Sequence, residues 1–103
     1  MVKVTRDWKE VLLDDLKAGR IVGVISKNVR FRINEFTEFL REKNLQFLYN
    51  TSGEVSIANY GKAMFFNDEP CRLKGVLFNN VIIFPKVSKE SRDLAKLGTR
   101  LVG

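Results

Sequence analysis

The chain has 103 residues, the length of one compact domain, so we predict a single domain over residues 1–103. It is 45% hydrophobic with eight phenylalanines, which is too apolar for a disordered tail and sufficient for a core. Lys and Arg outnumber Asp and Glu by 18 to 12, and the resulting net charge of +6 favours an anionic partner.

The absence of histidine and the single cysteine exclude several kinds of site. A zinc site usually needs about four Cys or His ligands at short spacing, so we expect no zinc and no other cofactor. Ser–His and Cys–His nucleophilic pairs cannot form. We expect Cys71, which follows Pro70 in a predicted turn, to be an inert thiol in a reducing compartment.

The distribution of apolar residues bears on localisation. The N-terminal residues carry a charge every two or three positions and lack an apolar stretch, so a secretory signal is not expected. The longest apolar runs, residues 76–78 and 81–84, are far too short to cross a membrane. We therefore expect a cytoplasmic protein that does not enter a membrane.

Hydrophobic periodicity predicts a helix and a buried strand at the start of the chain. Residues 7–18 begin with Asp7 as N-cap, repeat apolar residues every three or four positions, and are followed by Gly19, a suitable left-handed stop. Residues 21–25 are β-branched and uncharged, which is typical of a strand buried on both faces.

The next segment alternates apolar and basic residues. This pattern over residues 29–33 predicts a strand with Arg30 and Arg32 on one face, about 7 Å apart along the chain. Asn34 is then the expected N-cap of a second helix, and Asn44 is its expected left-handed stop.

The second half of the chain is predicted to hold further strands and a last helix. The strands are expected at residues 45–50, 54–60, 63–66, 76–78 and 81–84. Gly53 lies in the loop of the first hairpin, and Asn79 and Asn80 suit the type I′ turn of the second. Ser88 caps a helix over residues 89–97, which either ends at Gly98 or continues through it. The order, roughly αββαβββββα, predicts an α+β fold with about three helices on a mainly antiparallel sheet.

The positive charge is concentrated in two basic blocks that flank an acidic middle. Residues 20–32 carry four basic side chains and no acidic one, and residues 70–103 carry seven against Glu90 and Asp93. From these blocks we predict the nucleic-acid-binding residues Arg20, Lys27, Arg30, Arg32, Lys89, Arg92, Lys96 and Arg100. The last four are spaced by three, four and four residues, so a continuous helix places them on one stripe.

Each basic block also has an interpretation that needs no ligand. Arg30 and Arg32 can pair with carboxylates of a neighbouring element, and Lys96 and Arg100 are favoured by the dipole at a helix C-terminus. Tyrosines in the central strands can stack on bases if they are exposed, although aromatic residues on strands more often pack against their neighbours.

The sequence thus predicts a non-enzymatic nucleic-acid-binding protein. Its partner, DNA or RNA, is expected to be held mainly through phosphates with weak sequence selectivity. Small size, basic charge and richness in Lys, Asn, Ile and Phe resemble the composition of phage or viral accessory proteins. The alternative is a protein-interaction module, a regulator or inhibitor that docks on an acidic surface of a polymerase or nuclease. With either function, a homodimer is possible.

Enzymatic activity is not expected from these residues. The adjacent carboxylates Asp14 and Asp15, and likewise Asp68 and Glu69, lack a third ligand at a useful spacing, so neither pair predicts a metal site. A small ribonuclease that uses Arg, Lys and Tyr in place of His stays open, although nothing in the spacing selects an acid or a base.

Overall fold

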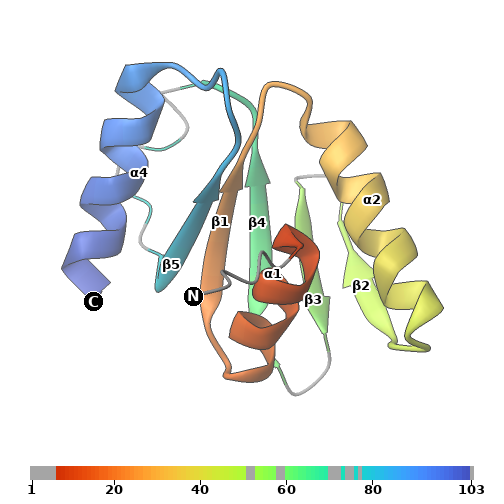
Figure 1. Cartoon of the computed structure of the whole chain (residues 1–103). Coiled ribbons are helices and arrows are strands. Elements are labelled where there is room, and N and C mark those ends of the chain that lie inside the picture. Colours follow the sequence, from red (N-terminus) through yellow and green to blue (C-terminus); the bar gives the residue numbers. More distant parts are fainter. Residues whose placement is uncertain are drawn as a thin grey trace, which may run out of the picture.

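The computed structural model describes residues 7–50, 53–57, 60–69, 73, 76 and 78–102, with the side chains of residues 97–102 excepted. Within this part of the chain the elements are α1 (Trp8–Lys17), β1 (Ile21–Ile25), α2 (Val29–Glu42), β2 (Phe47–Tyr49), β3 (Glu54–Ile57), β4 (Lys62–Phe66), β5 (Asn80–Ile83) and α4 (Lys89–Val102). The predicted α+β class is confirmed (Figure 1). Cys71 and Pro70 lie outside the described residues.

The five strands form one mixed sheet in the order β2-β3-β4-β1-β5. The central strand β1 pairs in parallel with β4 on one side and β5 on the other, while β2, β3 and β4 pair antiparallel. The register sets Ile25 opposite both Phe66 and Ile83, so β1, β4 and β5 end side by side. We call this side of the sheet the carboxyl edge; it is uppermost in Figure 1.

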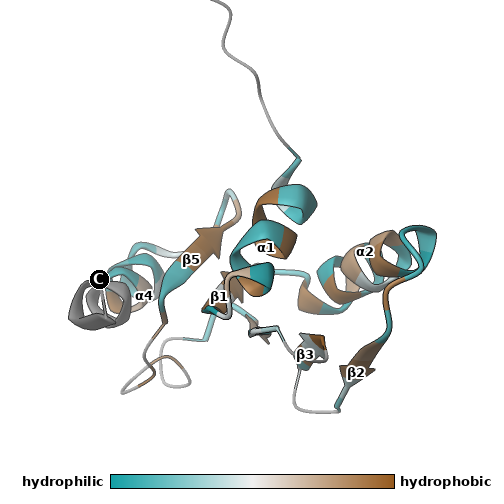
Figure 2. Ribbon diagram, turned by 90° about the horizontal axis from the view of Figure 1, so that it is seen from below, coloured by the Kyte–Doolittle hydropathy of each residue, from teal (hydrophilic) through white to brown (hydrophobic). Residues whose placement is uncertain are grey.

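The two faces of the sheet are covered by different elements. Helices α1 and α2 lie on one face, and α4 lies beside β5, at the opposite end of the sheet from β2 (Figure 2). Val22 and Val24 of β1 pack with α1 and α2, whereas Ile25 packs in a second cluster with Phe78 and Ala95. The predicted two-sided burial of β1 is confirmed, because strand residues alternate between the faces and both faces are covered.

The predicted strand over residues 29–33 is wrong, because these residues form the first turns of α2. The side chains of α2 that pack on the core recur at helical spacing: Val29, Ile33, Phe36 and Leu40. This stripe spans twelve residues. Its burial favours a helix more strongly than the alternation over residues 29–33 favours a strand. Asn28 rather than Asn34 is the N-cap, and its side chain accepts a hydrogen bond from the Phe31 amide at 3.3 Å.

The predicted hairpin around Asn79 and Asn80 is also wrong. Val76 and Phe78 lie outside strands, and residue 77 lies outside the described part of the chain. Asn79 instead binds the start of β1, where its side chain accepts from the Ile21 amide at 2.8 Å. Asn80 is the first residue of β5, which gains burial by joining the central strand in parallel rather than by folding back locally.

Several predicted element ends are confirmed. Asp7 caps α1 by accepting from the Lys9 amide at 3.4 Å, and Gly19 follows the helix at φ +80°. Asn44 ends α2 at φ 58°. Ser88 accepts from the Ser91 amide at 3.3 Å, and α4 continues through position 98. The hairpin of β2 and β3 is present as predicted.

We predict that Gly23→Ala lowers the free energy of unfolding by about 1–3 kcal/mol. A methyl group at Gly23 would lie 2.7 Å from the ring of Phe78, which is fully buried. Urea denaturation followed by circular dichroism measures the cost. In a Phe78→Leu background the same glycine substitution should cost clearly less, and equal costs in both backgrounds would contradict this contact.

Candidate nucleic-acid interface

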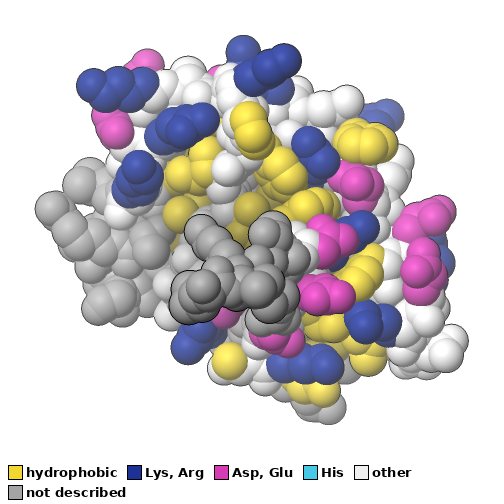
Figure 3. Space-filling view, in the orientation of Figure 1, with side chains coloured by type: hydrophobic (Ala, Val, Ile, Leu, Met, Phe, Trp, Pro, Cys, Tyr) yellow, Lys and Arg dark blue, Asp and Glu magenta, His cyan; other side chains and the backbone are white. Residues whose placement is uncertain are grey.

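The carboxyl edge gathers basic residues from two segments that are far apart in the sequence. The Phe84 amide donates to the Ile25 carbonyl at 3.0 Å, so the chains that follow β1 and β5 leave the sheet together. Four exposed cations lie in these two chains or in the first turns of the helices that follow them: Lys27, Arg30, Lys86 and Lys89. We call these four residues the basic edge. Figure 3 shows Lys and Arg side chains along the corresponding upper rim of the molecule.

Asp68 joins the two halves of the basic edge. Its carboxylate accepts hydrogen bonds from the Ser88 amide at 2.8 Å, the Ser88 hydroxyl at 2.7 Å and the Ser91 hydroxyl at 2.5 Å. Because Ser91 and Ser88 donate to the charged form and Lys27 adds a positive charge nearby, the pKa of Asp68 is held below its usual value. Asp68 therefore anchors the start of α4 beside the chain that contains Lys27.

Two helix N-termini add positive potential at the same place. Both α2 and α4 begin at the carboxyl edge, and the free amide groups of a first helical turn attract anions. The first turn of α2 contains no acidic residue, whereas that of α4 contains Glu90 and is already bound by the Asp68 carboxylate. The start of α2, which also carries Arg30, is thus the part of the basic edge with the least opposing charge.

Three of the eight predicted binding residues belong to the basic edge, namely Lys27, Arg30 and Lys89. Arg20 lies at the opposite edge of the sheet, where its guanidinium pairs with Asp15 at 2.8 Å. Lys96 is exposed but lies about 10 Å further along α4. The side chain of Arg100 lies outside the described residues.

Arg32 and Arg92 are engaged within the fold. The expectation that Arg30 and Arg32 share one face is wrong, since helical residues two apart point to nearly opposite sides. Arg32 pairs with Glu35 at 2.8 Å, and its guanidinium lies 3.9 Å from the ring centroid of Phe84. Arg92 donates from Nε to the carbonyl of Val87 at 3.0 Å. Both side chains are half-buried and support the structure.

Lys86 and Phe31 were not among the residues predicted from the sequence. Lys86 occupies the turn between β5 and α4 at φ 72°. It belongs to the second basic block but was not predicted as a binding residue, because it lies outside the helical stripe. Phe31 is 51% exposed in the first turn of α2, whereas the strand prediction placed it on the apolar face, opposite the two arginines. Tyr49 and Tyr60 are also exposed, Tyr49 at the carboxyl edge and Tyr60 at the opposite one.

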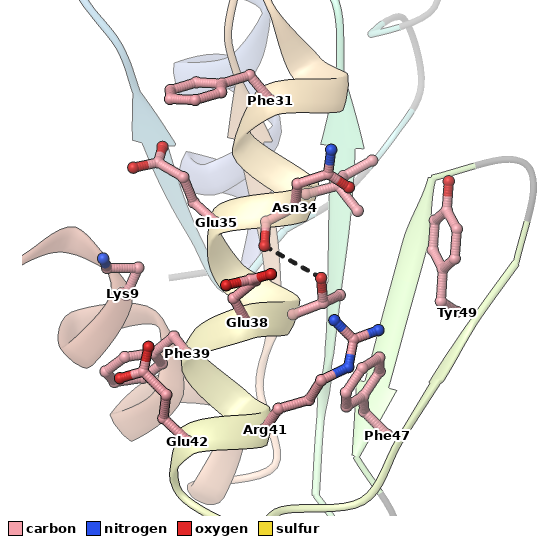
Figure 4. A pocket seen from close by; sticks show the side chains of 12 residues that line it. Lys9, Phe31, Asn34, Glu35, Glu38, Phe39, Arg41, Glu42, Phe47 and Tyr49 are labelled. Carbon is pink, nitrogen blue, oxygen red and sulfur yellow. Dashed lines mark hydrogen bonds between the residues drawn. The ribbon is translucent and has the colours of Figure 1, made fainter.

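A groove of about 550 Å³ runs along the outer surface of α2, from Phe31 toward β2 (Figure 4). Its lining includes Glu35, Glu38 and Glu42 of α2 and, on the far side, Tyr49. The same lining also contains Lys9 and Arg41, so three carboxylates there face two cations. The groove is therefore a weaker attractor of phosphates than the basic edge.

No family model matches this chain, and neither a curated protein nor a solved structure matches it. Among the described residues, none of the helices has the length and apolar character needed to cross a membrane. The same part of the chain holds no group of three or more metal-ligating side chains. The function must therefore be inferred from the residues of this chain.

We predict that the free energy of unfolding falls as the pH drops through about 4, where an Asp of the unfolded chain titrates. The unfolded chain then takes up a proton that the folded chain, with its lowered Asp68 pKa, still excludes. The contribution of Asp68 is complete above about pH 4 and is lost as the pH falls through the folded-state pKa. Urea melts between about pH 5 and 3 measure this slope.

The Asp68→Asn variant should show a shallower slope than the unmodified protein over this range. Asp93→Asn is the matched control, because it makes the same chemical change at an exposed position of α4. An unchanged slope in the Asp68 variant would show that its hydrogen bonds to Ser88 and Ser91 do not depend on the carboxylate charge.

Proposed function

We propose that this protein is a non-enzymatic, cytoplasmic nucleic-acid-binding protein that holds the phosphate backbone at its basic edge. The observation that carries the proposal is the meeting of Lys27 and Arg30 with Lys86 and Lys89, nearly sixty residues later in the chain, at one edge of the sheet. All four are exposed, and none has an ion pair among the described residues. Within the described part of the chain, Asp68 is the carboxylate that acts on one of these charges, that of Lys27, and the four side chains are exposed enough to contact phosphates.

The expected binding is electrostatic. Four cations that contact four phosphates release the counterions condensed there, so the logarithm of the binding constant should fall with the logarithm of salt concentration at a slope of about −3 to −4. Arginine binds phosphate through a planar fork and lysine as a point charge, and neither reads a base through such contacts. Weak sequence selectivity follows from this composition.

A protein-docking role is less well supported by the distribution of apolar residues. A protein interface needs an apolar centre in addition to charge. The largest exposed aliphatic side chain among the described residues, Leu48, is 77% exposed on β2, at the end of the sheet away from α4. Beside the basic edge, one exposed apolar ring, Phe31, is present among the described residues. A single ring is too little for the apolar centre of a protein interface, which favours a polyanion over a protein partner at the basic edge.

We predict that Arg30→Glu combined with Lys89→Glu weakens nucleic-acid binding about 100-fold, since each change replaces an attraction for phosphate by a repulsion. Each new carboxylate lies in the first turn of a helix, where the dipole favours it, so the fold should keep its stability. Fluorescence anisotropy with a labelled oligonucleotide at low salt measures binding, and gel analysis should recover that oligonucleotide uncleaved.

The matched control is Lys17→Glu combined with Lys43→Glu, which alters the net charge by the same amount at exposed positions of the opposite edge. It should change the affinity only a few-fold, through the overall charge. Equal losses in the two double variants would mean that the basic edge is not a site. Absence of binding to any DNA or RNA at low salt would refute the proposed function itself.

A further inference from the structure

We propose that the basic edge selects single-stranded over duplex nucleic acid, because Phe31 offers a stacking surface for an unpaired base. This inference rests on the proposed function and adds the class of ligand. Its starting observation is that a phenylalanine in the first turn of α2 is 51% exposed, directly beside Arg30. An apolar ring is thus placed among cations that attract phosphates.

Phe31 is held in position from one side by the residue that follows it. The Arg32 guanidinium lies 5.4 Å from the Phe31 ring centroid and 3.9 Å from that of Phe84. Glu35 fixes the guanidinium through its ion pair at 2.8 Å, and Trp8 meets the Phe84 ring edge-on at 5.1 Å between centroids. Phe31 therefore ends a series of contacting side chains that begins with Trp8, which is half-buried against the core.

The exposed fraction of Phe31 fits a ring that is covered by Arg32 on one side and open on the other. Figure 4 shows the ring projecting from the first turn of α2, clear of Glu38 and Glu42 further down the helix. A base placed against the open side would continue the series by one more layer. Because Arg32 restricts the ring from one side, part of its side-chain entropy is lost before the base binds.

Stacking of this kind distinguishes single strands from duplexes. In a duplex the faces of the bases are covered by their neighbours, whereas in a single strand they are accessible to aromatic side chains. Stacking is tolerant of sequence, because every base has a π-face, and this agrees with the weak selectivity expected of phosphate contacts. The cations near Phe31 hold the backbone of the same strand, so both interactions act on neighbouring nucleotides.

The test compares single strands with duplexes of the same length, using oligothymidylate and oligouridylate of about 15 nucleotides and mixed-sequence DNA and RNA duplexes. Fluorescence anisotropy at fixed low salt should show at least one of the single strands bound about tenfold more tightly than either duplex. The Phe31→Ala variant should lose about tenfold or more in affinity for that single strand and change little toward the duplexes. Phe31→Trp should keep the single-strand affinity.

Tyr60→Ala is the matched control, since it removes an exposed aromatic ring at the opposite edge of the sheet. It should leave single-strand binding unchanged, and circular dichroism should show both alanine variants folded. The salt dependence of Phe31→Ala should match that of the unmodified protein, because no phosphate contact is lost.

Two failures of this test are distinguishable. If the protein binds duplexes as tightly as single strands, or if Phe31→Ala binds single strands normally, the stacking inference is overturned while phosphate binding at the basic edge stands. If no strand or duplex binds at low salt, the proposed function fails and the inference fails with it.

Discussion

The parallel pairing of β1 with both β4 and β5 is the constraint on which the rest of this structure depends. Because neighbouring parallel strands end together, this pairing brings the loops after β1 and β5 and the first turns of α2 and α4 to one edge. The sequence of β1 suits a central strand. It is uncharged and buried on both faces, and Gly23 leaves room for the ring of Phe78. Without this parallel pairing, the two basic blocks would not be brought to the same edge of the sheet.

The protein uses its arginines and lysines in two different ways. Arg20, Arg32 and Arg92 have partners within the fold: a carboxylate, a carboxylate with an aromatic ring, and a backbone carbonyl, respectively. The residues of the basic edge have no such partners among the described residues and are exposed. Arg32 and Arg92 lie on the same helices as Arg30 and Lys89, but their side chains are half-buried and have partners within the fold, whereas those of the basic edge are exposed.

The surface is polarised around α2. Its first turn combines the positive end of the helix dipole, Arg30 and the exposed ring of Phe31, whereas the outer face further along carries Glu38 and Glu42 beside Arg41. The start of the helix therefore attracts a polyanion more strongly than the groove, where three carboxylates face two cations. Under the proposed function, a bound strand would thus run across the carboxyl edge, from the start of α2 toward the start of α4, rather than down the groove beside β2.

The sequence by itself determined the features that depend on local chemistry. The α+β class, the caps Asp7 and Ser88, the left-handed stops Gly19 and Asn44, and the two basic blocks all follow from residues a few positions apart. Tertiary structure decided the rest. Residues 29–33 satisfy both a strand period and a helix period, and only packing of the longer apolar stripe on the sheet selects the helix, which turns Arg32 inward and leaves Phe31 exposed. Likewise, β5 pairs with a strand almost sixty residues earlier, and local patterns carry no information about such distant pairing.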